Sequence, residues 1–263
     1  MGAEPVLIDH HGAVARITLN RPQAANSINL PLARAFADAV DRCADDPAVR
    51  CVLLTGQGRF FCAGGDVTAF AEAGDDVASF INSLTERMHA ATRRLVAMDK
   101  PLVTAINGPA AGAGLSLAML GDVALAAASS HFTLAYGAIG LTPDGGATWL
   151  LPRLIGLRRA QEFAFTGMRL AAQRAADWGL VTRVVEDAAL LSEGLTAATA
   201  LAKSATGAIA ITRNLLYESF SAMLATRLDQ EARAIAASSQ SAHARTALAA
   251  YLQRRPAVFD QGN

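Results

Sequence analysis

The residues with the clearest chemical promise lie in a glycine- and alanine-rich turn between residues 107 and 114. A β-branched run at residues 102–106 precedes the turn and is typical of a buried strand, and an apolar helical segment follows from Leu115. A helix that begins directly after a tight turn leaves its first N–H groups without intrahelical acceptors. Small side chains let a ligand approach such groups closely. The stretch from Thr104 to Gly121 therefore predicts a site that binds a negatively charged group through main-chain N–H groups.

This turn belongs to a chain in which strands and helices alternate. The expected elements are, in order, a hairpin over residues 6–19, a helix over 30–43, a strand over 49–55, a long helix over 76–98, the strand over 102–106, a strand over 123–126, an extended segment over 132–134, helices over 147–154, 157–165 and 171–178, and a strand over 181–185. From about Asp187 the chain is rich in alanine and helical. The alternation indicates an α/β fold with a helical appendage, which we divide into a core over 1–200 and a helical region over 201–263.

The composition excludes several classes of function. Lys and Arg together number 23, as do Asp and Glu, and the resulting zero net charge argues against a nucleic-acid partner. The three cysteines have no CxxC spacing and no HxxH motif occurs, so we expect no metal site and a reducing, cytoplasmic location. No apolar segment reaches membrane-spanning length, and the first residues lack the basic and apolar pattern of a secretory signal, so we expect neither a membrane span nor secretion. The apolar content of 52% suggests that subunit contacts cover part of the surface.

Five short motifs follow one another along the chain. They are Asn20-Arg21-Pro22, the turn from Gly58 to Asp66, the turn from Asn107 to Gly114, the turn from Gly140 to Gly146, and the end segment from Arg254 to Phe259. In this order they resemble the motifs of the crotonase (enoyl-CoA hydratase/isomerase) superfamily. Within that superfamily, the segment from Gly140 to Arg153 is most similar to the phenylacetate-pathway type of enoyl-CoA isomerase.

The resemblance implies a crotonase-like spiral of ββα units with a C-terminal α-helical trimerisation region. It also implies a homotrimer or dimer of trimers, acyl-CoA thioester substrates, and no cofactor beyond the coenzyme A of the substrate. The shared chemistry of the superfamily stabilises a thioester enolate with two main-chain N–H groups, which by resemblance belong to Ala63 and Ala113. Losing one such donor typically costs about 3–4 kcal/mol of barrier. The alternative is that both turns only let strand and helix pack closely.

By the same resemblance, coenzyme A contacts a loop and two turns. The residues expected there are Ala24, Ala25, Gly64, Gly65, Asp66 and Gly112. Asp66 also fits the first position of a helix. Arg254 and Arg255 either reach the phosphates of coenzyme A or form a solvated helix end.

The sequence departs from the hydratases at their two catalytic glutamates, which fall at Ser116 and Tyr136. The remaining carboxylate in this neighbourhood is Asp144, and one base suffices to move a proton along an allylic thioester. We therefore expect Asp144 to be catalytic, with apolar walls from Phe61, Leu141 and Trp149. The alternative is that Asp144 caps the helix over residues 147–154.

Tyr136 has more than one interpretation, and no catalytic role is expected for the histidines at positions 89, 131 and 243. Tyr136 either bonds the substrate or orients Asp144, or it is an interior tyrosine with a satisfied hydroxyl. His89, His131 and His243 are interpreted as ordinary helix or loop residues. The sequence thus favours an enoyl-CoA isomerase. The alternatives are a hydratase with displaced carboxylates, a dehalogenase-like enzyme with Asp144 as nucleophile, and a non-catalytic acyl-CoA-binding subunit.

Overall fold

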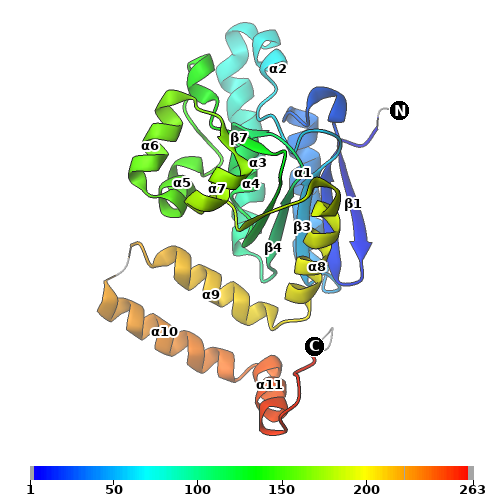
Figure 1. Cartoon of the computed structure of the whole chain (residues 1–263), viewed down its shortest axis with the longest axis vertical. Helices are drawn as coiled ribbons and strands as arrows, with labels where there is room; N and C mark the ends of the chain where they lie inside the picture. The colour runs from blue at the N-terminus through cyan, green and yellow to red at the C-terminus, as the bar shows by residue number, and fades with distance from the viewer. Residues whose placement is uncertain (1–2, 222, 260–263) are drawn as a thin grey trace.

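A six-stranded sheet forms the centre of the main body in the computed structural model, which describes residues 3–221 and 223–259 (Figure 1). Its strand order is β1-β2-β3-β4-β6-β9. The strands are β1 (Val6–His11), β2 (Val14–Leu19), β3 (Cys51–Gly56), β4 (Leu102–Ile106), β6 (Val123–Ala127) and β9 (Arg183–Val185). The first two form an antiparallel hairpin, and all later neighbours are parallel. Parallel strands are normally covered on both faces, and the continuous apolar run of β3 fits that position.

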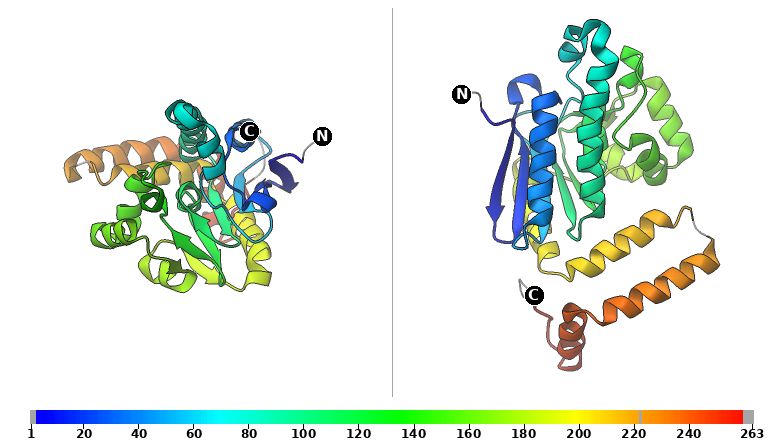
Figure 2. Two further views of the ribbon diagram at one scale, coloured as in Figure 1. Left: turned by 90° about the horizontal axis from the view of Figure 1, so that it is seen from above. Right: turned by 180° about the vertical axis from the view of Figure 1, so that it is seen from behind.

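Helices cover both faces of this sheet (Figure 2). Helices α1 (Leu30–Asp45) and α3 (Val77–Ala97) pack together over one face, and α8 (Leu190–Ala202) covers the other. Asn29 caps α1 by accepting the Leu32 N–H at 3.0 Å. From there Leu32, Phe36 and Val40 recur at helical spacing and are buried, so the sequence period sets which side of α1 meets the sheet.

A second, three-stranded sheet carries the turn between residues 107 and 114. Its order is β5 (Ala110–Ala111), β7 (His131–Thr133) and β8 (Leu170–Ala171). Helix α4 (Ala113–Ala118) follows β5 directly and begins two residues earlier than the apolar pattern predicted, because Gly112 makes the turn with φ +52°. The two-residue strands β5 and β8 were not predicted, since two residues are too few to show alternation.

The remaining helices include a group that extends beyond the body. Within the body lie α2 (Val67–Glu72), α5 (Ala147–Ile155), α6 (Leu157–Thr166) and α7 (Ala172–Trp178), whereas α9 (Thr206–Glu218), α10 (Leu224–Ser239) and α11 (Ala242–Leu252) form a separate layer (Figure 1). The predicted α/β fold with a C-terminal helical region is confirmed. In the described part of the chain, no single helix has the length and apolar character to cross a membrane.

Arg213 ties the C-terminal layer to the body. Its guanidinium donates to the Asp122 carboxylate at 2.9 Å, to the Lys100 carbonyl at 3.3 Å and, over a short contact, to the Met98 carbonyl. Asp122 is held in turn by the Leu102 N–H at 2.8 Å. Burial raises the pKa of Asp122, and the Arg213 charge opposes that effect. A buried ion pair therefore fixes α9 at the end of β4.

Candidate active site

A cavity of about 490 Å³ opens beside the turn between residues 107 and 114. Two glycine-rich turns, α3 and the segment 135–144 surround it. Its apolar walls are Ile28, Val67, Phe70, Ile81, Leu84, Met88, Ile139 and Leu141. Asp144 is the only carboxylate among its lining residues in the described part of the chain. The cavity is thus mostly apolar with few polar groups, as small-molecule sites usually are.

Two glycines allow the turns to touch behind the cavity. A β-carbon on Gly64, whose φ is +95°, would lie 2.7 Å from the Ala111 carbonyl oxygen and 3.3 Å from the Ala113 nitrogen. A β-carbon on Gly114 would lie 2.2 Å from the Cys62 carbonyl oxygen. Neither position has room for a side chain, so glycine is required for the close approach.

Some main-chain N–H groups at these turns donate hydrogen bonds within the chain, and others have no acceptor. Ala63 donates to the Ala25 carbonyl at 3.0 Å, so its predicted role as an oxyanion donor is wrong. Ile28 donates to the Gly64 carbonyl at 2.7 Å and accepts from Asp66 at 3.0 Å. Because alternate residues of an extended segment point to opposite sides, Gly65 directs its N–H away from Ile28.

Two free donors result at the cavity. Gly65 and Ala113 both line it, and within the described residues neither N–H has a hydrogen-bond acceptor. Ala113 opens α4, where the first N–H groups have no intrahelical partner. Gly112, which also lines the cavity, is anchored through its N–H to the Thr133 carbonyl at 3.1 Å.

Asn26 holds the first turn in place. Its side chain is completely buried, and its Nδ2 lies 2.7 Å from the Phe60 carbonyl and 3.0 Å from the Gln57 carbonyl. Its Oδ1 accepts the Arg21 N–H at 2.8 Å. One amide side chain therefore links the loop after η1 (Pro22–Ala24) to the segment that leads into the glycine turn.

The residues predicted to contact coenzyme A fall into two groups. Gly64, Gly65 and Gly112 line the cavity. Ala24, Ala25 and Asp66 lie outside its lining. The Asp66 carboxylate caps α2 and pairs with Arg21 at 3.1 Å, which matches its interpretation as a helix-start residue. Arg254 and Arg255 are exposed beyond the end of α11.

Asp144 and Tyr136 are joined by a short hydrogen bond. Tyr136, the first residue of η3 (Tyr136–Ile139), donates its hydroxyl to Oδ1 of Asp144. Burial, and then the charge of Asp144, raises the pKa of Tyr136 above its ordinary value, so the phenol remains a donor. The alternative of an N-cap role is wrong, because Gly146 caps α5 and no side chain bonds to that helix end. Asp144 instead lines the cavity, where its carboxylate accepts the Tyr136 hydrogen bond.

Ser116 supports the chain that carries Asp144. Its Oγ donates to the Asp144 carbonyl at 2.9 Å. A β-carbon on Gly145, whose φ is +62°, would lie 2.9 Å from the Ser116 β-carbon. The small Ser116 side chain therefore leaves room for the Asp144–Gly145 turn.

Two residues predicted to form apolar walls of the cavity do not line it, and one neighbour of Asp144 was not predicted. Phe61 is fully buried away from the cavity, and Trp149 packs edge-on against Tyr217 with ring centroids 5.3 Å apart. His89 on α3, interpreted as an ordinary helix residue, accepts the Gly145 N–H at 3.2 Å through Nε2. The same atom lies 3.9 Å from Oδ2 of Asp144. No short-range pattern indicates a contact between residues so distant along the chain.

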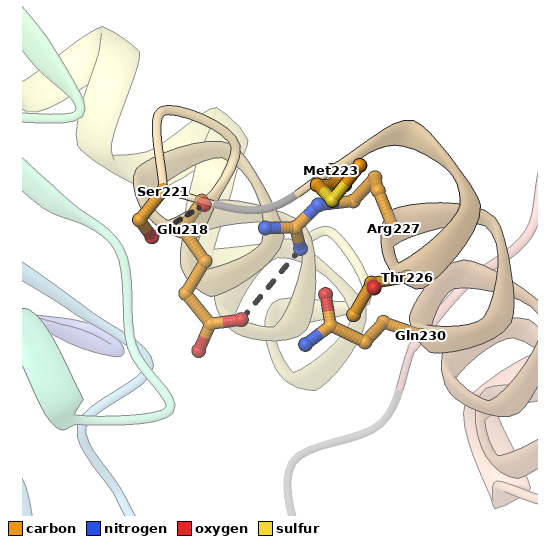
Figure 3. Close-up of a pocket in the computed structure, with 6 residues that line it drawn as sticks. All are labelled: Glu218, Ser221, Met223, Thr226, Arg227 and Gln230. Atoms are coloured by element: carbon orange, nitrogen blue, oxygen red, sulfur yellow. Dashed lines mark hydrogen bonds and ion pairs between the residues drawn. The ribbon is translucent and has the colours of Figure 1, made fainter.

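A second cavity, of about 480 Å³, lies between α9 and α10 (Figure 3). Arg227 is buried there and pairs with Glu218 at 3.6 Å. Within the described residues, all three guanidinium nitrogens of Arg227 and Oε1 of Gln230 lack hydrogen bonds. Across the described ranges, no group of three or more His, Cys, Asp or Glu is arranged to hold a metal ion.

Comparisons with known proteins give one consistent result. The family described as enoyl-CoA hydratase/isomerase matches residues 9–262. A 1,2-epoxyphenylacetyl-CoA isomerase of Escherichia coli (strain K12) is 36% identical over 254 residues, which covers 94% of each chain. A 2,3-dehydroadipyl-CoA hydratase of the same organism is 31% identical and covers 97% of this chain and 98% of the relative. The solved structure of an enoyl-CoA hydratase from Polaromonas sp. JS666 matches with a TM-score of 0.91 at 30% identity, over 97% of this chain and 98% of that chain.

Proposed function

Since the chain belongs to the enoyl-CoA hydratase/isomerase family, we propose that it moves a carbon–carbon double bond within an enoyl-CoA thioester. The observation that carries this proposal is the single carboxylate of the cavity lining, Asp144. An isomerase needs one base that takes and returns a proton, whereas water addition needs a water molecule that is both oriented and deprotonated.

In the proposed reaction, Asp144 removes a proton from the carbon next to the thioester carbonyl of a 3-enoyl thioester. The electron pair of the broken C–H bond forms a dienolate, whose charge develops on the thioester oxygen. Asp144 then returns the proton two carbons further along the acyl chain, and the double bond moves into conjugation with the carbonyl. Atoms and charge balance without a cofactor other than the coenzyme A of the substrate.

The developing oxyanion is assigned to the N–H groups of Gly65 and Ala113. Both line the cavity and both lack acceptors in the described residues, and these two facts support the assignment. Donors fixed before the reaction stabilise a transition state without reorganisation, and one donor is worth about 3–4 kcal/mol. Gly65 thus takes the place that the sequence had suggested for Ala63.

Water addition is the second candidate, because hydratases also occur among the relatives. Ser116 and Tyr136 stand where hydratases have glutamates, and each is already bonded to Asp144. A non-catalytic acyl-CoA-binding role remains as a third outcome of the same test.

The test is a panel of 2-enoyl and 3-enoyl thioesters followed by ultraviolet absorbance and NMR. Interconversion without water uptake supports the proposal, and 3-hydroxyacyl products overturn it. Asp144→Asn is expected to lower turnover at least about 100-fold and to retain binding of a saturated acyl-CoA. Asp99→Asn, at an exposed carboxylate outside the cavity lining, is the matched control. A binding-only protein would show no turnover in any variant.

We also propose that the chain assembles as a homotrimer or a dimer of trimers. Exposed large apolar side chains gather on and between α9–α11, namely Leu216, Phe220, Met223, Leu224, Leu228, Ile235, Leu248, Tyr251 and Leu252. Contact with another copy would cover this surface and supply partners to Arg227 and Gln230. Light scattering of the purified protein tests the proposal, and a monomer at micromolar concentration contradicts it.

A further inference from the structure

His89 stands behind the carboxylate that the proposed function uses. Its Nε2 accepts the Gly145 N–H at 3.2 Å, and the same nitrogen lies 3.9 Å from Oδ2 of Asp144. The imidazole comes from α3, and Asp144 and Gly145 come from the turn that precedes α5. One ring atom therefore faces two groups of opposite character, an N–H donor and a carboxylate acceptor.

A single ring nitrogen can serve only one of these neighbours at a time. An unprotonated Nε2 accepts a hydrogen bond from Gly145 and has no proton to give Asp144. A protonated Nε2 donates and can no longer accept, so the Gly145 N–H loses its acceptor and Asp144 becomes the favoured partner. The observed contacts correspond to the neutral ring with its proton on Nδ1.

No other charged group within the described residues competes for this ring. Tyr136 reaches it only through Asp144, to which it is hydrogen-bonded. On α3 itself, Glu86 and Arg93 form no hydrogen bond or ion pair with His89. On α1, which packs against α3, Asp41 and Asp45 pair with Arg94 instead.

We propose that neutral His89 positions Asp144 for proton transfer. Protonation of the ring replaces the Gly145 hydrogen bond with an ion pair to Asp144. This ion pair moves the carboxylate away from the position in which it transfers the proton. His89 is a positioning residue in this scheme, since it acts through Asp144 and does not line the cavity. The inference rests on the proposed function for its kinetic consequence, although the exchange of hydrogen bonds stands independently. Histidine is the side chain that ordinarily changes charge between about pH 5 and 8.

Two variants separate the two parts of the inference. His89→Gln keeps an acceptor oxygen near the position of Nε2 but cannot become charged. His89→Ala removes the acceptor altogether. Glu86→Gln, on the exposed side of the same helix, is the matched control. Initial rates of thioester isomerisation are measured for all four proteins from pH 5 to 9, with kcat and KM determined separately.

The expected results differ between the variants. His89→Ala lowers kcat about tenfold at every pH and changes KM less than twofold, because a positioning hydrogen bond is lost. His89→Gln retains kcat within about threefold at pH 8 and lacks the acid decline expected of the wild type, because glutamine cannot become charged. Glu86→Gln behaves as the wild type. An unchanged acid decline in His89→Gln overturns the proposal.

A second measurement uses the wild-type protein alone and needs no turnover. Nitrogen NMR of the imidazole is expected to show an unprotonated Nε2 at pH 8, and the Gly145 amide signal should shift as the ring becomes charged. The inference is overturned if Nε2 carries a proton at pH 8. It is also overturned if the Gly145 amide signal does not shift when the ring is protonated. If the wild type isomerises no thioester, the proposed function fails while this measurement still decides the role of His89.

Discussion

The hydroxyl of Tyr136 donates to Oδ1 of Asp144 from eight positions earlier in the chain, so one short segment supplies both the proposed base and a hydrogen-bond donor that holds it. The bond leaves Oδ2 for the substrate and for the neighbourhood of His89. Because burial and the Asp144 charge raise the pKa of Tyr136, the phenol keeps its proton throughout the neutral range.

Tyr136→Phe removes this bond without changing the ring. Hydrogen bonds to charged groups contribute about 1.5–3 kcal/mol, which corresponds to a fall in kcat of about 10- to 100-fold. KM should change little, because the cavity keeps its shape. Steady-state kinetics with a 3-enoyl thioester check the prediction. A variant with wild-type kcat would show that Asp144 needs no orienting partner.

Tyr136 also makes the free energy of unfolding depend on pH in the alkaline range. The pKa of Tyr136 is higher in the folded chain than its ordinary value of 10.0, so above about pH 10 the unfolded chain releases this proton first. Stability from this group is fully present below that pH and is lost as pH rises. The wild type should therefore lose about 1 kcal/mol more than Tyr136→Phe between pH 10 and 11. Urea unfolding of both proteins measures the difference, and parallel pH curves would contradict it.

The helices and strands that position this site are predicted from the sequence more accurately than the residues of the site. The strand over 102–106 coincides with β4, and the helix over 76–98 matches α3 to within one residue at each end. Both have a strong apolar period and clear ends, which are local properties. The choice of Asp144 also came from the sequence, since no carboxylate stands at position 116 or 136.

What the sequence could not predict depends on contacts between distant segments. Ala63 and Gly65 lie in the same turn, and only the pairing with Ile28 and Ala25 determines which N–H is free. Phe61 and Trp149 are both large and apolar, so their type fits a cavity wall as well as a core position. His89 reaches Gly145 because α3 passes behind the turn, which no local pattern encodes.

Gly64→Ala should separate the two turns that hold the proposed oxyanion donors, the N–H groups of Gly65 and Ala113. A β-carbon there meets the Ala111 carbonyl at 2.7 Å, and the positive φ of 95° adds about 1–2 kcal/mol of strain. Misplacing one donor should lower kcat by at least about 100-fold. Gly12→Ala is the control, since its φ of +59° is also positive but nothing lies within 4 Å. Equal kcat values for the two variants would exclude the turn contact as a catalytic requirement.

Arg213→Met should loosen α9 and destabilise the whole chain. Removing one partner of a buried ion pair costs about 3–5 kcal/mol, because the largely covered Asp122 carboxylate loses its counter-charge. Adding Asp122→Asn should restore part of this loss. Arg183→Met breaks the exposed pair with Glu193 and should cost at most about 1 kcal/mol. Urea unfolding and hydrogen exchange over α9 check both, and equal costs for the two arginines would contradict the anchoring role.

Ser116→Glu places a carboxylate at the position that by resemblance is a glutamate in hydratases, and we expect it to destroy the proposed isomerase activity without creating a hydratase. The β-carbon of Ser116 already lies 2.9 Å from the place of a Gly145 β-carbon, and its Oγ fixes the Asp144 carbonyl at 2.9 Å. A longer side chain must displace this turn and Asp144 with it, and overpacking typically costs about 1–3 kcal/mol. Ser116→Ala, which loses one hydrogen bond without adding volume, should retain kcat within about tenfold. Product analysis by NMR with a 2-enoyl thioester tests this prediction. A 3-hydroxyacyl product from Ser116→Glu would contradict it, because the turn would then accommodate a second carboxylate. The choice between isomerisation and hydration would in that case depend on position 116 alone.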